Sequence, residues 1–360
     1  MKKEYDLYEY LKPIWRSNII TNETIMFLDE DDVAPLLYAP AEIISVKNYN
    51  LTQTYVEGKD YVVSNGKIKR TPESAIPFIA KKDYYSEEPG KYGIEVNAET
   101  IGYTGEKKLY LAYGEGDSFT RYQIAVTYSH SGKWQGAIPS CRIEKLPKTH
   151  EKVVSGGDLN VTFYGDSIMT GCNSSGTPMG GNVSPYMEAY PNLITQFLSE
   201  EYGTNAVCTN VSQGGWNTKE GLDAFEERVL KQPGDLLVLG FGMNDLVTPP
   251  TDYRDMIEEM LLRFRQSNPS AEVILVATMW PHVESTWLLN QIKMLPYLRE
   301  LEEKYPFVAV ADMTTMHAEI MSAGKRYRDM TANNINHPND FLARVYAQVI
   351  LTAFLGDDYI

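Results

Sequence analysis

The stretch Asn-Val-Thr-Phe-Tyr-Gly-Asp-Ser-Ile at residues 160–168 decides how the rest of the chain is interpreted. Its apolar residues predict a buried strand, and Gly165, Asp166 and Ser167 follow that strand directly. A serine hydroxyl is thereby placed at a strand-to-helix turn, and open α/β sheets bind their ligands outside the carboxyl ends of the strands. Because Gly-Asp-Ser is also ordinary turn sequence, the serine marks a site only if it has partners.

The first candidate partner is Asn-Val-Ser-Gln-Gly-Gly-Trp-Asn at residues 210–217, which follows a short strand at 206–209 and opens a helix from about residue 218. Paired glycines allow positive φ and a close approach of the backbone to a ligand. The unsatisfied N–H groups at the start of the helix favour an anion. The segment therefore predicts either part of an anion site or a plain glycine turn.

The second candidate partner is Gly-Phe-Gly-Met-Asn-Asp at residues 240–245, directly after the apolar run 235–239. An amide at Asn244, projecting from a strand end, can donate a hydrogen bond to an oxyanion that forms in a transition state. The alternative is that Asn244 or Asp245 caps the following turn.

The third candidate partner is Asn-Asn-Ile-Asn-His-Pro-Asn-Asp at residues 333–340, ahead of a helix with a long apolar stripe. Asp340 is suited to the N-cap of that helix. His337 is therefore expected in a polar loop at the start of the helix. That environment favours a general base over a buried structural histidine.

These four segments, in this order, resemble the signature blocks of the SGNH (GDSL-type) hydrolase superfamily, over about residues 158–355. The resemblance implies serine-ester hydrolysis without a metal or another cofactor. Ser167 would be the nucleophile and His337 the general base. The oxyanion hole would consist of the backbone N–H groups of Ser167 and Gly215 and the side-chain amide of Asn244.

One position departs from the pattern of the superfamily, which usually has an aspartate three residues before the histidine, where this chain has Asn334. An asparagine can accept the Nδ1–H bond, but it offers no charge to the imidazolium, and an acid-to-amide change in a serine-protease triad lowers turnover by about 10⁴. Either Asn334 or a backbone carbonyl orients the ring of a Ser–His dyad, or an acid from elsewhere replaces the aspartate. Asp340 and Asp329 are the nearby acids. Because Asp340 is expected to cap a helix, the dyad is preferred.

The chain divides into two parts with different periodicity. At 360 residues it is long for a single core. Residues 151–360 are interpreted as a hydrolase domain and residues 1–150 as an accessory β domain, with linker-like or strand sequence at 146–157. In the hydrolase domain, strands are expected at 161–164, 206–210, 235–240, 272–278 and 307–313, and helices at about 190–202, 218–231, 252–267, 285–304 and 340–354. This alternation predicts a doubly wound α/β fold, in agreement with the flavodoxin-like three-layer α/β/α sandwich that the resemblance implies.

Residues 1–150 contain short runs rich in β-branched and aromatic residues, separated by turn signals. Ser64-Asn65-Gly66 between two such runs predicts a β-hairpin. Short strands at this spacing are typical of a β-sandwich or jelly roll.

Composition restricts the partners of the chain. A net charge of −15 argues against nucleic-acid binding and against adhesion to anionic membranes. Neutral sugars or small esters fit such a surface, and a homo-oligomer is compatible with it. The amino-terminal residues lack the apolar segment of a signal peptide, and three scattered cysteines indicate reduced thiols, so a cytoplasmic protein is expected.

The substrate is expected to be an acylated saccharide, because the chain resembles SGNH-type carbohydrate esterases that carry an N-terminal jelly roll. Short acyl groups, above all acetyl, would be removed from sugar hydroxyls. Asp166, Trp216, Trp280 and His282 are expected to contact the substrate, although turn, core or loop roles would also explain them. A lipid-directed esterase or thioesterase and a catalytically decayed glycan-binding protein are the alternatives.

Overall fold

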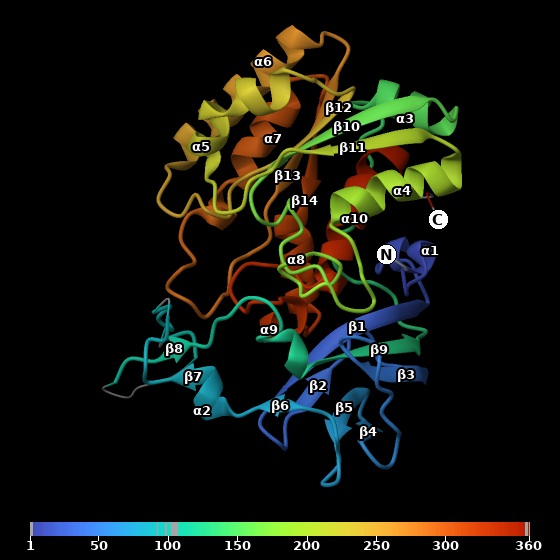
Figure 1. Cartoon of the computed structure of the whole chain (residues 1–360), viewed down its shortest axis with the longest axis vertical. Coiled ribbons are helices and arrows are strands. Elements are labelled where there is room, and N and C mark those ends of the chain that lie inside the picture. Colours follow the sequence, from blue (N-terminus) through green and yellow to red (C-terminus); the bar gives the residue numbers. More distant parts are fainter. Residues whose placement is uncertain (1–2, 92, 98, 102–106, 357–358, 360) are drawn as a thin grey trace.

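The computed structural model describes residues 3–91, 93–97, 99–101, 107–356 and 359. Figure 1 shows an α/β part built from the carboxyl-terminal half of the chain and, below it, a β-rich part built from the amino-terminal residues. The two parts correspond to the two kinds of periodicity in the sequence.

The α/β part contains one parallel sheet of five strands, in the order β11-β10-β12-β13-β14. Its strands are β10 (Asp158–Gly165), β11 (Asn205–Asn210), β12 (Leu236–Gly240), β13 (Glu272–Ala277) and β14 (Val308–Asp312). Four of the five strands are mostly buried, as near-continuous apolar runs require when both faces of a sheet are covered. The strand order is that of flavodoxin-like sheets, which confirms the predicted fold class.

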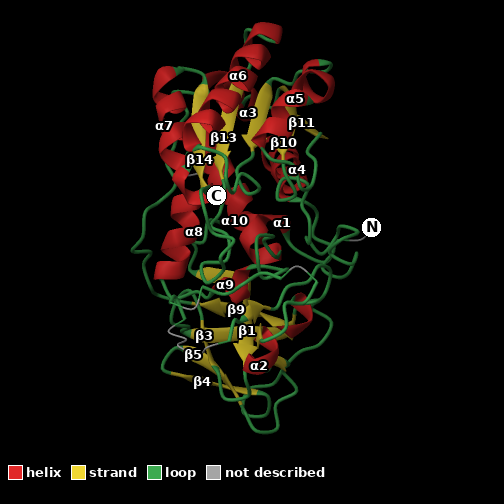
Figure 2. Cartoon of the chain, turned by 90° about the vertical axis from the view of Figure 1, so that its left-hand side faces the viewer, coloured by secondary structure: helices red, strands yellow, loops and turns green. Residues whose placement is uncertain are grey.

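Helices cover both faces of this sheet and make the three layers seen in Figures 1 and 2. One face carries α3 (Pro147–Val154), α4 (Tyr190–Tyr202) and α10 (Asp340–Leu355), and the other carries α5 (Thr218–Asp223), α6 (Pro250–Ser267) and α7 (Leu295–Lys304). Strand residues alternate between the two cores: Val238 packs into the core under α4 and α10, whereas Leu237 and Leu239 pack into the core under α6 and α7. Two further helices, α8 (Met313–Ser322) and α9 (Tyr327–Met330), follow β14.

Three predicted elements of this part are corrected by the structure. The segment 146–157 forms the helix α3, with Pro147 in its first turn, rather than a linker or a strand. The helix expected at 285–304 begins only at Leu295, because Pro296 fits the first turn of a helix but not its interior. The helix expected at 218–231 is divided into α5 and a π-helical turn at Glu226–Leu230.

In its described residues, the β-rich part contains three small sheets. The largest has the order β3-β9-β1-β6 and is antiparallel except for its β1–β6 pair. Its strands are β1 (Ile19–Leu28), β3 (Glu42–Asn48), β6 (Phe78–Ile79) and β9 (Gln123–Ser129). The second sheet consists of β2 (Val33–Pro35), β4 (Tyr61–Ser64) and β5 (Lys67–Arg70). The third sheet is the pair β7 (Tyr85–Ser86) and β8 (Tyr110–Leu111). These mainly antiparallel sheets fit the predicted sandwich, but the jelly roll is not confirmed.

The predicted hairpin is confirmed, since β4 and β5 pair on either side of Asn65 and Gly66. Both turn residues have positive φ, 51° and 72°, as the tight turn between twisted strands requires.

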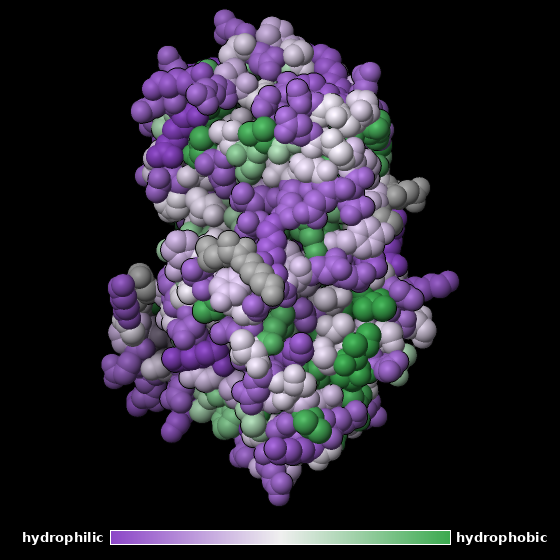
Figure 3. Space-filling model, turned by 45° about the vertical axis from the view of Figure 1, so that its right-hand side comes forward, coloured by the Kyte–Doolittle hydropathy of each residue, from purple (hydrophilic) through white to green (hydrophobic). Residues whose placement is uncertain are grey.

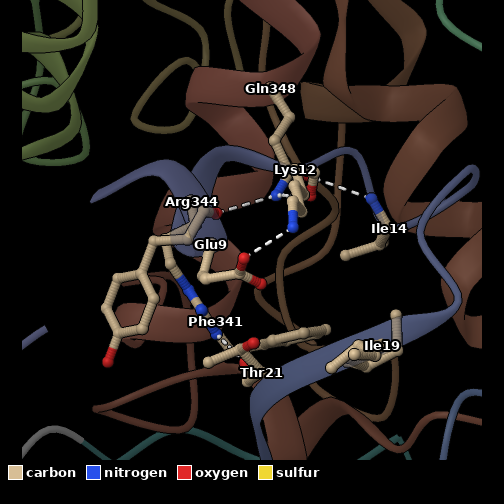
Figure 4. Close-up of a pocket in the computed structure, with 10 residues that line it drawn as sticks. Glu9, Lys12, Ile14, Ile19, Thr21, Phe341, Arg344 and Gln348 are labelled. Carbon is tan, nitrogen blue, oxygen red and sulfur yellow. Dashed lines mark hydrogen bonds and ion pairs between the residues drawn. The ribbon is translucent and has the colours of Figure 1, made fainter. Parts of the chain in front are cut away.

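The amino-terminal helix α1 (Leu7–Leu11) lies against α10 of the α/β part. Figure 4 shows the small cavity between α1, β1 and α10, which holds about 10 Å³. Gln348 on α10 donates hydrogen bonds to the backbone carbonyls of Tyr10 and Lys12, at 3.1 and 2.9 Å. Buried apolar residues of both parts also belong to one continuous hydrophobic core. The domain boundary at residue 150 stays a prediction. Among the described residues, no helix has both the length and the apolar character that crossing a bilayer requires.

Candidate active site

Ser167 lies at the carboxyl end of β10, immediately beside the end of β12. The two strand ends meet at Gly165 and Gly240, where a β-carbon on Gly165 would lie 2.2 Å from the carbonyl oxygen of Gly240. Only glycine fits at position 165, and this close approach sets the turn that carries the serine. The Ser167 side chain lies in the turn that follows and is buried.

His337 faces the serine from the loop between α9 and α10. Its Nε2 lies 2.9 Å from Ser167 Oγ, although the two residues are 170 positions apart in the sequence. The loop is shaped by Asn333, whose Oδ1 accepts hydrogen bonds from the N–H groups of Ile335, Asn336 and His337, each at 3.0 Å. One asparagine side chain therefore fixes the backbone on which the imidazole is carried.

The other ring nitrogen, Nδ1, faces two oxygen acceptors. Asn173 Oδ1 lies at 2.7 Å and Glu115 Oε2 at 3.2 Å. An amide oxygen and a carboxylate only accept hydrogen bonds, so the ring proton is on Nδ1 and Nε2 is free to accept the serine proton. This is the tautomer that a general base requires.

Glu115 comes from the β-rich part of the chain and is held by several donors. The Tyr113 hydroxyl donates to it, and Asn333 Nδ2 donates to its Oε1 at 3.1 Å. Burial alone would raise the pKa of Glu115, but its hydrogen bond to His337, the charge of that ring and the two other donors hold the pKa at about 2. Glu115 is therefore a carboxylate at neutral pH.

Asn334, expected to orient the ring, does not contact it. Its Oδ1 accepts from the Tyr84 hydroxyl at 2.9 Å, and its Nδ2 donates to the Ala112 carbonyl at 3.0 Å. With φ at 69°, Asn334 adopts a left-handed conformation that asparagine tolerates better than most residues. Through these hydrogen bonds Asn334 connects the histidine loop to the β-rich part. Asn173 and Glu115 lie beside His337 Nδ1, where Asn334 was expected.

The two acids considered as substitutes are also placed elsewhere. Asp329 is buried and pairs with Arg326 at 3.0 Å. Asp340 accepts a hydrogen bond from the Ser175 N–H at 2.9 Å. Asp340 is not the N-cap of α10 either, because that role belongs to Asn339, whose side chain accepts from the Leu342 N–H.

Three N–H donors are available beside the serine. Gly215, with φ at 82°, follows Gly214, whose β-carbon position lies 3.7 Å from Ser167 Cβ. Within the described part of the chain, no acceptor is recorded for the backbone N–H of Ser167 or of Gly215. Asn244 Nδ2 donates to the Trp216 carbonyl at 2.9 Å, which leaves its second N–H for another acceptor.

Asp245 joins the segments that carry these donors. Its carboxylate accepts hydrogen bonds from the N–H and the hydroxyl of Thr218, at 3.1 and 2.8 Å. The segment after β12 is thereby attached to the start of α5, immediately after the glycine pair. Asp245 thus fixes the relative position of Asn244 and Gly215.

Asp166 is buried beneath the serine rather than directed at solvent. Its Oδ1 accepts from the Ile168 N–H at 2.9 Å, and the Met243 N–H also donates to it. Burial, only partly offset by these donors and by His337, raises the pKa of Asp166 to about 7. Asp166 therefore supports the turn, and its contact with substrate stays a prediction.

His282 is buried, with only 1% of the residue exposed, and its predicted contact with substrate stays a prediction. Its Nδ1 accepts from the Glu284 N–H at 3.2 Å, so Nε2 carries the proton and donates to the Tyr84 hydroxyl at 3.0 Å. Burial lowers the pKa of His282 to about 3, which keeps the ring neutral.

The two tryptophans have local partners. The guanidinium of Arg228 lies 4.5 Å from the ring centroid of Trp216, which is half-buried against the core under α6. The Trp280 indole donates to the Thr314 carbonyl at 3.0 Å. A substrate contact of either ring stays a prediction.

Comparison with known proteins gives the family. Residues 163–344, about half of the chain, match the model of the GDSL-like lipase/acylhydrolase family. No curated protein matches.

Several solved structures are similar at low identity. A two-domain esterase active on acetylated mannans, co-crystallized with mannopentaose, is 20% identical with a TM-score of 0.45, and the match covers 59% of this chain and 53% of that one. A catalytic mutant of the acetylxylan esterase Axe2 from Geobacillus stearothermophilus is 15% identical with a TM-score of 0.45, over 56% of this chain and 96% of that one. LAE5, an alpha/beta hydrolase from the metagenome of Lake Arreo, Spain, is 17% identical with a TM-score of 0.45, over 56% and 97%.

The chain thus spans about half the length of the two-domain esterase. From the extent of the family match, the chain belongs to the GDSL-like lipase/acylhydrolase family.

Proposed function

We propose that this protein is a serine esterase that removes short acyl groups, above all acetyl, from carbohydrate hydroxyls. The observation that carries the proposal is the 2.9 Å contact between Ser167 Oγ and His337 Nε2, beside two backbone N–H groups that have no acceptor among the described residues. A nucleophile, a base in the required tautomer and oxyanion donors are the parts that acyl transfer needs.

The proposed reaction has two halves. His337 Nε2 takes the hydroxyl proton as Ser167 Oγ attacks the ester carbonyl, and the tetrahedral oxyanion is held by the N–H groups of Ser167 and Gly215 and by the Asn244 amide. The imidazolium then returns its proton to the sugar oxygen, and the ester C–O bond breaks to leave an acyl-enzyme. Water repeats the sequence on the acyl-enzyme and releases the acid and free Ser167.

The assignment of Asn244 predicts the effect of Asn244→Ala. Removing one oxyanion donor typically lowers kcat by about 10²–10³, because the donor acts mainly on the transition state. We expect kcat for a chromogenic acetate ester to fall by about that factor, with a much smaller change in KM. Asn290→Ala is the control, since Asn290 Nδ2 donates to the Thr248 carbonyl at 3.1 Å but has no proposed role. Equal kcat values in the two variants would remove Asn244 from the oxyanion hole.

A short acyl group is supported by the space around the nucleophile turn. The cavity lined by Asp166, Ile168 and Met169 holds about 10 Å³. About that volume accommodates one water molecule, so this cavity beside the nucleophile turn is too small for a long acyl chain.

A carbohydrate leaving group is supported by charge and surface composition. The net charge of −15 disfavours anionic polymers and anionic membranes as substrates. On the face shown in Figure 3, apolar residues form separate patches among hydrophilic ones. Of the similar solved structures named above, one is an esterase active on acetylated mannans and another is a mutant of an acetylxylan esterase. The cytoplasmic location stays a prediction.

Acyl-chain length provides the test against a lipid-directed esterase. With 4-nitrophenyl esters from acetate to octanoate, we expect kcat/KM to fall by at least about tenfold as the chain lengthens, since a site for a short acyl group has to accommodate each added methylene. A panel of acetylated manno- and xylo-oligosaccharides, followed by mass spectrometry, should show stepwise loss of acetyl groups, with Ser167→Ala as the background. Rates that rise toward octanoate, together with no loss of acetyl groups from the oligosaccharides, would contradict the proposal and indicate a lipid-directed esterase.

A further inference from the structure

The acid that faces the catalytic histidine comes from the other part of the chain. Glu115 lies 222 residues before His337, in the loop that follows β8, whereas Ser167 and His337 both belong to the α/β part. The position where related hydrolases usually have an aspartate is filled by Asn334, which is bonded elsewhere.

We propose that Glu115 is the positioning carboxylate of this site: it stabilises the protonated form of His337 while Asn173 fixes the tautomer of the ring, so that the β-rich part completes the catalytic machinery. This role rests on the proposed function, because it acts on the proton transfer from Ser167.

The two groups that face His337 Nδ1 have different roles, because one is a neutral amide and the other is a carboxylate. Asn173 Oδ1, at 2.7 Å, is the closer acceptor of the single Nδ1–H, but an amide carries no net charge. Glu115 Oε2, at 3.2 Å, adds the negative charge, which strengthens its interaction with the ring only when the ring becomes an imidazolium. The proton stays on Nδ1 throughout, so Glu115 remains ionised while Nε2 gains and loses the serine proton.

The loop that carries Glu115 is built to hold the carboxylate in place. The Ser118 hydroxyl donates to the Glu115 carbonyl at 2.7 Å, and a β-carbon on Gly114 would lie 2.5 Å from that hydroxyl. Gly116 has φ at 69° and lies next to the Met179 carbonyl in the loop after the nucleophile. The loop thus has a defined turn before and after the glutamate.

The same segment is attached to the histidine loop at further points. Asn333 Nδ2 donates to Glu115 Oε1 at 3.1 Å, and Asn334 Nδ2 donates to the Ala112 carbonyl at 3.0 Å. Asn333 is also the residue that shapes the backbone of His337. Asn333 therefore helps to position both the Glu115 carboxylate and the His337 imidazole.

Glu115→Gln removes the charge and keeps the size of the side chain. The reaction should become slower, because a hydrogen bond to a charged group is stronger than one between neutral groups. The effect is reduced by solvent, because the Glu115 side chain is 28% exposed. We therefore expect a roughly 10- to 100-fold slower reaction, rather than the loss of about 10⁴ that follows removal of the acid in a serine-protease triad. The readout is the second-order rate constant for labelling of Ser167 by a fluorophosphonate as a function of pH. This probe needs an activated serine but no particular substrate.

The pH profile separates a charge effect from a structural one. The carboxylate of Glu115 favours the protonated ring and the amide of glutamine does not, so removing the charge should move the acid limb of the profile to lower pH while the plateau falls. Asp166 and Cys172 also lie near these groups, and both are unchanged in every variant.

Two further variants complete the design. Glu115→Gln combined with Asn173→Asp places a carboxylate at the closer acceptor position and should recover at least about tenfold of the lost rate and return the acid limb. Glu284→Gln is the matched control: Glu284 accepts from Tyr85 at 2.7 Å between the same two parts of the chain but does not contact His337, and its rate should stay within about twofold of wild type.

Each outcome has a distinct meaning. Equal labelling of the Glu115→Gln and Glu284→Gln variants would overturn the role of Glu115, as would a slower rate with an unmoved acid limb and no recovery by Asn173→Asp. Loss of folding in both Glu115→Gln and Glu115→Asp would contradict it too, because the role would then be structural. Failure of the wild-type protein to label would overturn the esterase proposal itself. A labelled protein with the expected Glu115 effect that hydrolyses no sugar ester would overturn only the proposed substrate.

Discussion

Ser167→Ala is expected to abolish ester hydrolysis, lowering kcat by about 10⁶, because the variant has no nucleophile and only the binding and oxyanion groups remain. The fold should be unaffected, since among the described residues the side-chain hydroxyl forms a hydrogen bond with His337 alone. The measurement is hydrolysis of a chromogenic acetate ester, together with a thermal melting curve.

Ser199→Ala serves as the control for this experiment. Its hydroxyl donates to the Thr195 carbonyl at 3.0 Å on α4, away from the strand ends that carry the site. Activity should be unchanged in this variant. Wild-type activity in Ser167→Ala would show that another residue is the nucleophile.

Lys325→Met is expected to cause the largest loss of stability, about 3–5 kcal/mol in the free energy of unfolding. Lys325 Nζ lies 2.7 Å from Glu23 Oε1, and both side chains are 0% exposed. Glu23 also accepts from the Leu37 N–H at 2.8 Å and the Tyr128 hydroxyl at 2.6 Å, so it cannot turn to solvent when its cation is removed. The cost is that of an unpaired buried charge, measured by urea unfolding.

A double variant distinguishes that cost from a simple packing defect. Glu23→Leu combined with Lys325→Met removes both charges and should recover part of the lost stability, since apolar replacements of a buried pair are often near neutral. Lys219→Met, which breaks an exposed pair with Asp223, should change stability far less. A Lys325→Met variant as stable as Lys219→Met would contradict the structural importance of the buried pair.

The α/β part could be predicted from the sequence because its signals are local. Each strand is an apolar run, and the helix expected at 190–202 begins and ends at Tyr190 and Tyr202 in the structure. The errors lie where local pattern and tertiary context compete. Pro147 supports the start of α3 in a segment whose composition suggested a linker, and Pro296 delays α7 within an apparently continuous helical pattern.

The candidate site could be predicted only in part, for a physical reason. Ser167 and His337 belong to motifs whose position relative to strands and helices is visible in the sequence. Glu115 belongs to no such motif and reaches the ring through the packing of the β-rich part on the histidine loop, which no local pattern encodes. Its sequence signal is an acid between two glycines, Gly114 and Gly116, a pattern that is also typical of an ordinary turn.

Asn173 was missed for a related reason. It lies in the Gly/Ser-rich loop after the nucleophile, where the sequence contains no regular pattern. In the structure this loop is packed, and Asn173 is only 1% exposed with φ at 68°. Its side chain faces Nδ1 because of that backbone conformation, which the sequence alone does not specify.

The most direct test is a crystal structure of the protein after reaction with a fluorophosphonate, whose adduct resembles the tetrahedral intermediate. The phosphorus should be bonded to Ser167 Oγ, with one phosphoryl oxygen about 2.7–3.1 Å from the N–H groups of Ser167 and Gly215 and from Asn244 Nδ2. An adduct on another residue, or a phosphoryl oxygen that none of these three donors reaches, would contradict the proposed site.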